Sequence, residues 1–177
     1  MQASTATNGN KTSKAIFIKM VLSAWDTYNA RVDKLITALS DDQLLAETAP
    51  QRNSGVYLLG HLIAVSDGLM PILGFGERFF PQLDKIFLES PDKSGHEMPS
   101  LNDLKEYWKK INTELTGHII RMPEDEWFAR HNNVSEADFA NEPHRNKLNI
   151  IINRTNHTSY HLGQLVYLAK KEGQATD

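Results

Sequence analysis

The segment from Arg145 to Glu172 reads RNKLNIIINRTNHTSYHLGQLVYLAKKE, and its spacing of apolar residues predicts one long amphipathic helix. Gly173 follows it as the expected C-terminal stop. Inside the segment, His157 and His161 are separated by one helical turn. Side chains at positions i and i+4 lie about 40° apart around a helix axis, so both imidazole rings can converge on one ion. The segment therefore predicts a helix with two candidate metal ligands on one face.

This helix is expected to be apolar on two sides. Besides the two histidines, its first face carries Ile150, Asn153, Gln164 and Leu168. Its second face carries Leu148, Ile151, Ile152, Leu162, Val166 and Ala169. We expect the histidine face to point into a helix bundle. The second stripe would then pack against a neighbouring helix, or against a second copy of the chain in a homodimer.

Three further amphipathic helices are expected upstream, because apolar residues recur there at three- and four-residue spacing. They cover residues 16–39, 54–73 and 100–122. A long connection over residues 74–99 is expected to contain one short helix, and residues 130–142 are expected to form a polar loop. No stretch shows the alternation of a strand. We therefore predict an all-α fold, a four-helix bundle with long crossover connections and short extra helices.

Composition indicates one soluble domain and excludes several classes of protein. The 177 residues are 40% hydrophobic and can bury a substantial core. The net charge of -3 provides no basic patch for nucleic acid, and zero cysteines exclude disulfides and thiolate zinc sites. Without a signal segment or a membrane-spanning apolar run, we predict a cytoplasmic protein. Residues 14–173 should form the bundle domain, residues 1–13 a disordered or weakly docked segment, and residues 174–177 a tail.

A third metal ligand is offered by His61, in the middle of the second predicted helix. Its face of that helix is mainly apolar, with Tyr57, Leu58, Val65 and Ile72 around it. A buried imidazole is costly unless it is ligated or hydrogen-bonded. His96, His131 and His144 lie in polar, turn-like segments and are expected to be ordinary surface imidazoles, and His118 has no second histidine nearby.

Two motifs, SGVYLLGHL at residues 54–62 and HTSYHLGQL at residues 157–165, resemble in order and spacing the DinB/YfiT-like family of metalloenzymes. The similarity runs from the first helix to about Glu172. It implies an up-up-down-down type of bundle, often dimeric, in which His61, His157 and His161 hold a divalent metal ion together with water. The ion would be zinc or nickel first, with iron or manganese as alternatives. Characterised relatives include S-transferases and isomerases that use low-molecular-weight thiols, while many members have no known activity.

The resemblance and the residues together favour a metal-dependent enzyme that acts on a small-molecule substrate. The metal would activate water, as in a hydrolase, or a low-molecular-weight thiol, as in a thiol S-transferase. The thiol would come from outside, since the chain has no cysteine. A zinc protease is disfavoured because Thr158 stands where its helical motif requires glutamate. Two alternatives stay open. One is a non-catalytic bundle that binds a metal or small ligand, and the other is a structural dimer with packed histidines.

Four polar residues are candidates for supporting roles at the site. Asn153 and Gln164 lie on the histidine face and could bind substrate or orient the ligands. Tyr57 could bind a cofactor or accept a hydrogen bond from an imidazole N–H, as metal-bound histidines usually require. Asp67 is the weaker candidate for the same role because it projects away from the face of His61.

Overall fold

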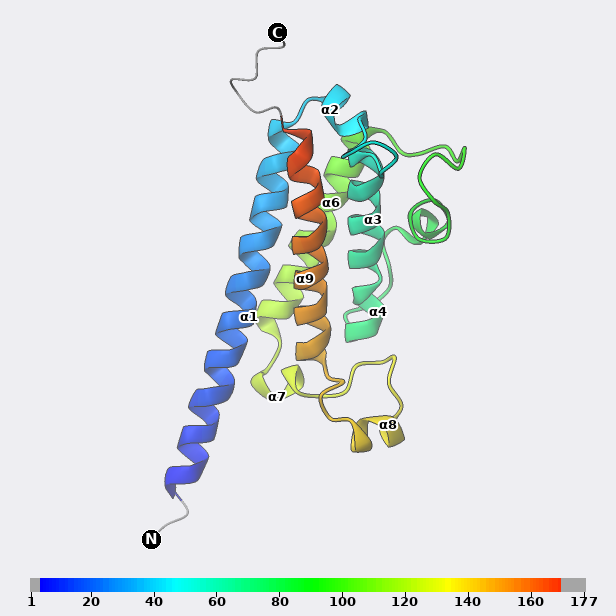
Figure 1. Cartoon of the computed structure of the whole chain (residues 1–177). Helices are drawn as coiled ribbons and strands as arrows, with labels where there is room; N and C mark the ends of the chain where they lie inside the picture. Colours follow the sequence, from blue (N-terminus) through cyan, green and yellow to red (C-terminus); the bar gives the residue numbers. More distant parts are fainter. Residues whose placement is uncertain (1–3, 170–177) are drawn as a thin grey trace.

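The computed structural model describes residues 4–169, with side chains from residue 13 onward. Four long helices form a bundle: α1 (Ser4–Ala38), α3 (Gly55–Asp67), α6 (Leu101–Arg121) and α9 (Lys147–Leu165) (Figure 1). The shorter helices are α2 (Asp41–Leu45), α4 (Leu69–Leu73), α5 (Asp84–Phe87), α7 (Glu124–Trp127) and α8 (Glu136–Asn141), with 3-10 turns η1 (Pro81–Leu83) and η2 (Val166–Leu168). Residues 4–169 contain no strand. The predicted all-α bundle is confirmed.

The helix directions differ from those that the family resemblance implied. Helices α1 and α9 run one way and α3 and α6 the other, giving up-down-down-up rather than up-up-down-down (Figure 1). The short link through α2 reverses the chain between α1 and α3. The long crossover then carries the chain back to the same end of the bundle, so α6 runs parallel to α3. The histidine-bearing helix α9 therefore lies antiparallel to α3.

Side-chain caps set the start of three of the four long helices. Ser54 begins α3 by accepting a hydrogen bond from the backbone N–H of Tyr57, and Ser100 begins α6 in the same way. Asn146 caps α9, which therefore starts at Lys147 rather than at Arg145. Each cap satisfies an N–H group that the first helical turn cannot pair internally.

Several boundaries differ from the predictions. Helix α1 begins at Ser4, so the backbone from there to Ser13 is helical although its polar composition favoured an irregular segment. Once the docked part of a helix has nucleated, each added residue costs little, which explains the extension. Residues 130–142 contain helix α8, because Ser135 accepts a hydrogen bond from the N–H of Asp138 and caps it. The predicted stop at Gly173 and the tail 174–177 lie outside the described residues.

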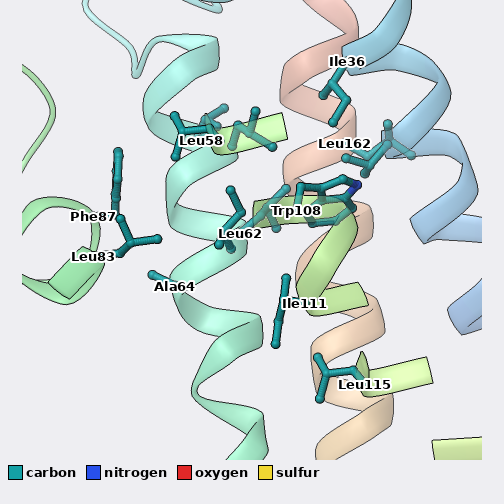
Figure 2. Packing of buried hydrophobic residues seen from close by; sticks show 14 of the residues in the cluster. Ile36, Leu58, Leu62, Ala64, Leu83, Phe87, Trp108, Ile111, Leu115 and Leu162 are labelled. Carbon is teal, nitrogen blue, oxygen red and sulfur yellow. The ribbon is translucent and has the colours of Figure 1, made fainter. Parts of the chain in front are cut away.

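The core lies between the four long helices. Trp108, Ile111 and Leu115 of α6 are buried in the same core as Leu58 and Leu62 of α3 and Leu162 of α9 (Figure 2). Leu83 and Phe87 of the crossover lie near the opposite side of α3, toward Ala64 (Figure 2). Helix α3 is therefore apolar around most of its circumference. The stretch of α3 and α4 is long and apolar enough by composition to cross a membrane, but most of it is buried inside the bundle, as expected of a core helix.

A buried carboxylate holds the crossover against α3. Asp67 is fully buried and accepts hydrogen bonds from the backbone N–H groups of Phe79, at 2.8 Å, and Phe80, at 3.0 Å. It also pairs with the Arg78 guanidinium at 3.0 Å, and Arg78 in turn bonds Asp84 at the start of α5. Three donors satisfy the carboxylate, which explains how a charge can be buried here. The network fixes where α5 meets α3, and a backbone carbonyl of α5 in turn contacts His61.

Candidate metal centre

Three histidine side chains from two helices meet in the bundle. His61 comes from α3, and His157 and His161 come from α9. The Nε2 atom of His157 lies 3.2 Å from Nε2 of His61 and 3.1 Å from Nε2 of His161. His161 is buried, and the other two are half-buried. Antiparallel packing of α3 on α9 thus joins residues 96 positions apart in sequence.

These nitrogen separations fit a tetrahedral ion. Zinc–imidazole bonds of about 2.0–2.1 Å at tetrahedral angles place ligand nitrogens about 3.3 Å apart. The candidate ligand atoms of the three rings all lie within 4.8 Å of one another, and the three residues could hold a metal ion. Three imidazoles would leave a fourth coordination position for water or substrate.

Hydrogen bonds behind two of the rings orient them for ligation. Nδ1 of His61 lies 2.9 Å from the backbone carbonyl of Phe87 in α5, and Nδ1 of His161 lies 2.7 Å from Oε1 of Gln164. Both partners are acceptors, so each Nδ1 carries the ring proton and donates it. Each Nε2 therefore presents its lone pair toward the other rings. Metal-binding histidines are usually held by such bonds.

Comparison with known proteins identifies the family of the chain. The profile of the DinB superfamily matches residues 24–165, which include both motifs and all three histidines. The chain belongs to the DinB superfamily. The matched residues cover most of the bundle, including both histidine-bearing helices α3 and α9.

A solved structure shows how far the fold is shared. The DinB-superfamily chain is similar to a conserved protein from Enterococcus faecalis, with a TM-score of 0.59 and 13% sequence identity over 85% of this chain and 93% of the other. At this identity the likeness concerns the fold alone. No curated protein is similar enough in sequence to count as a relative.

The third ring of the DinB-superfamily site has a different neighbour. Nδ1 of His157 lies 3.5 Å from Nη1 of Arg154, one turn earlier on α9. Arg154 is not among the site residues predicted from the sequence, although it precedes His157 by three residues and His161 by seven and so shares their face. That spacing was the available signal.

Burial keeps the three imidazoles neutral. It lowers the pKa of His61 and of His161. Burial first, and then the neighbouring His161, Arg154 and His61, lower the pKa of His157 to about 3. A neutral imidazole is the form that binds a metal. Protons would therefore compete weakly with a metal ion near neutral pH.

The supporting candidates have mixed outcomes. Gln164 contacts His161 as described, whereas Asn153 is exposed to solvent. Tyr57 supports the site indirectly. Its hydroxyl donates to the carbonyl of Ser90 at 2.6 Å and so holds the segment that contains Phe87, whose carbonyl contacts His61. Asp67 does not orient a ring, because its oxygens are used by the crossover.

The other histidines differ from expectation in one case. His131, predicted to be on the surface, is buried, and its Nδ1 accepts a hydrogen bond from the N–H of Asn133. The local sequence is polar, but the chain folds back against the end of the bundle and covers the ring. His144 is exposed as expected. His118 stacks on Phe75, with ring centroids 4.9 Å apart.

The predicted second stripe of α9 divides between the core and the surface. Ile151 and Leu162 are buried in the bundle, whereas Ile152 and Val166 are exposed. The reason is that α1 runs along α9 and covers part of this face (Figure 1). The remaining exposed apolar residues on α9 continue onto α1.

Proposed function

We propose that this protein binds a divalent metal ion, zinc or nickel before iron or manganese, through His61, His157 and His161. We further propose that it is an enzyme of hydrolase or thiol S-transferase type that acts on a small molecule. The supporting observation is the convergence of three neutral imidazoles with Nε2 separations of 3.1 and 3.2 Å. His61 and His161 direct their Nε2 lone pairs toward Nε2 of His157, which is the arrangement that a metal ion bound to all three rings would need.

Each residue around the triad has a distinct task in this proposal. His61 and His161 are fixed by acceptors on their Nδ1 atoms, so their rings cannot rotate away. Tyr160 of α9 is 64% exposed and its ring packs edge-on against His161, with centroids 5.0 Å apart, which places the triad near the surface. A bound ion would supply Lewis-acid activation of water or of a small thiol. The chain itself would position the substrate and limit its access to solvent.

Metal content tests the first half of the proposal. The protein is purified without a nickel column, and metal is measured by mass spectrometry. We expect about one ion per chain, lost in His61→Ala. His144→Ala is the matched control, because that histidine is exposed and distant from the triad in sequence. Sub-stoichiometric metal in the wild type, or unchanged metal in His61→Ala, would refute the site.

Turnover tests the second half. Ester substrates, and electrophiles offered with low-molecular-weight thiols, are screened with the metal-loaded protein, with chelated protein as the control. Activity that disappears on chelation and returns with the metal would support an enzyme. A loaded protein that turns over none of them would favour the non-catalytic alternative, a bundle that binds a metal or small ligand.

A further inference from the structure

Arg154 carries a half-buried positive charge without a counter-charge. Its Nε atom is buried and has no hydrogen-bond partner. Among the side chains described, from residue 13 to residue 169, it forms no ion pair with a carboxylate. Burial lowers its pKa to about 10, so the group still carries its charge at neutral pH. A buried cation is expected to have an anionic or strongly accepting partner.

The contact with His157 shows where that partner belongs. A guanidinium can only donate, so in the metal-free arrangement Nδ1 of His157 accepts from Arg154 and the ring proton sits on Nε2. A histidine that ligates through Nε2 carries its proton on Nδ1 instead. Two donors, the Nδ1–H of His157 and the guanidinium of Arg154, would then face each other. His61 and His161 have no such conflict, since their Nδ1 atoms meet acceptors.

We propose that an oxyanion group of the small-molecule substrate, a carboxylate or a phosphate, binds between Arg154 and His157 when the three histidines hold their metal. The inference rests on the proposed function and deepens it by naming the substrate class. An oxyanion accepts from both donors and supplies the missing counter-charge, and the planar fork of arginine matches it in shape. Because one anion satisfies both groups, anion binding and metal binding strengthen each other.

Calorimetric titration of the zinc-loaded protein with sodium acetate and, separately, with inorganic phosphate tests the proposal, and the two probes distinguish a carboxylate from a phosphate site. We expect at least one probe to bind with a Kd of about 1 mM or lower. Arg154→Gln should keep its zinc and bind that probe about tenfold more weakly or worse, since a hydrogen bond to a charged group contributes about that factor. The anion affinity of Arg154→Lys should lie between those of the wild type and Arg154→Gln. The matched control Arg52→Gln, at an exposed position in a loop, should bind like the wild type.

A second readout needs no variant. The Nε–H resonance of Arg154 in the wild type should shift on addition of the anion and not on addition of the same concentration of chloride. An unchanged resonance, equal binding by Arg154→Gln, or no binding of either probe would overturn the proposal. If the wild type holds no zinc, the proposed function fails separately. The same titrations on metal-free protein then decide the anion site, because Arg154-dependent binding would sustain it and its absence would refute it.

Discussion

Gly60 is where one methyl group should affect both the fold and the metal site. It precedes His61 on α3 and packs beneath Phe87, whose carbonyl accepts the Nδ1–H of that histidine. A Cβ atom added at Gly60 would lie 2.3 Å from two ring carbons of Phe87. Non-bonded carbons require about 3.5–4.0 Å, so in Gly60→Ala the ring must move by more than about 1 Å.

The size of the effect on stability follows from a comparison with Gly163, a glycine of α9 two residues after His161. A Cβ there would meet nothing within 4 Å. Both substitutions gain about 1 kcal/mol of helix propensity. Only Gly60→Ala overpacks a fully buried ring, which costs about 1–3 kcal/mol. The difference in free energy of unfolding between the two variants should therefore be about 1–3 kcal/mol, with Gly60→Ala the less stable.

Urea unfolding of the chelated proteins measures this difference without any contribution from metal. Zinc affinity is measured separately by competition with a coloured chelator. Moving Phe87 weakens the bond that orients His61, so Gly60→Ala should bind zinc about 10- to 100-fold more weakly, and Gly163→Ala should match the wild type. If the two variants are equally stable and bind zinc equally well, the argument that the crossover positions His61 is wrong.

Three other predictions concern Gln164, His157 and the exposed apolar residues of α1 and α9. Gln164→Leu removes the acceptor for the Nδ1–H of His161 and should therefore weaken zinc binding about 10- to 100-fold. The same chelator competition measures this affinity, and an unchanged affinity would contradict the prediction. Burial depresses the pKa of His157 to about 3, while an unfolded imidazole titrates near 6.5, so the unfolded state takes up protons first as the pH falls. The free energy of unfolding of the chelated wild type should therefore drop between about pH 6.5 and pH 3, and it should drop by less in His157→Gln. Urea unfolding measures both. If the wild type and His157→Gln have lost the same free energy of unfolding at about pH 5, the reasoning is refuted. We also propose a homodimer through the exposed apolar residues Phe17, Met20 and Ile152, which line a shallow cavity of about 300 Å³ between α1 and α9. Sedimentation should show two chains per particle for the wild type and one for Ile152→Glu. A monomeric wild type at micromolar concentration would exclude the dimer.

Much of the site could be predicted from sequence because its signals are local. The relation between His157 and His161 is fixed by helix geometry, and the apolar neighbours of His61 indicate that its ring faces the interior of the bundle. Gln164 follows by the same rule. The role of Asp67 could not be read this way, since its partners come from a crossover whose path depends on packing.

Sequence alone determined the four helical segments and the pair of ligands on α9, because helical periodicity relates residues within a few turns whatever the rest of the chain does. Only the tertiary structure decided that α3 lies antiparallel to α9 and brings His61 to the pair. It also decided that a carbonyl of α5 orients His61, and that Arg154 is half-buried without a counter-charge, with its Nε atom buried and unpaired. The physical reason is that a polar residue looks the same in sequence whether it faces solvent or the interior. Its burial and its partners are set by which helix packs against it, and that is a property of the whole chain.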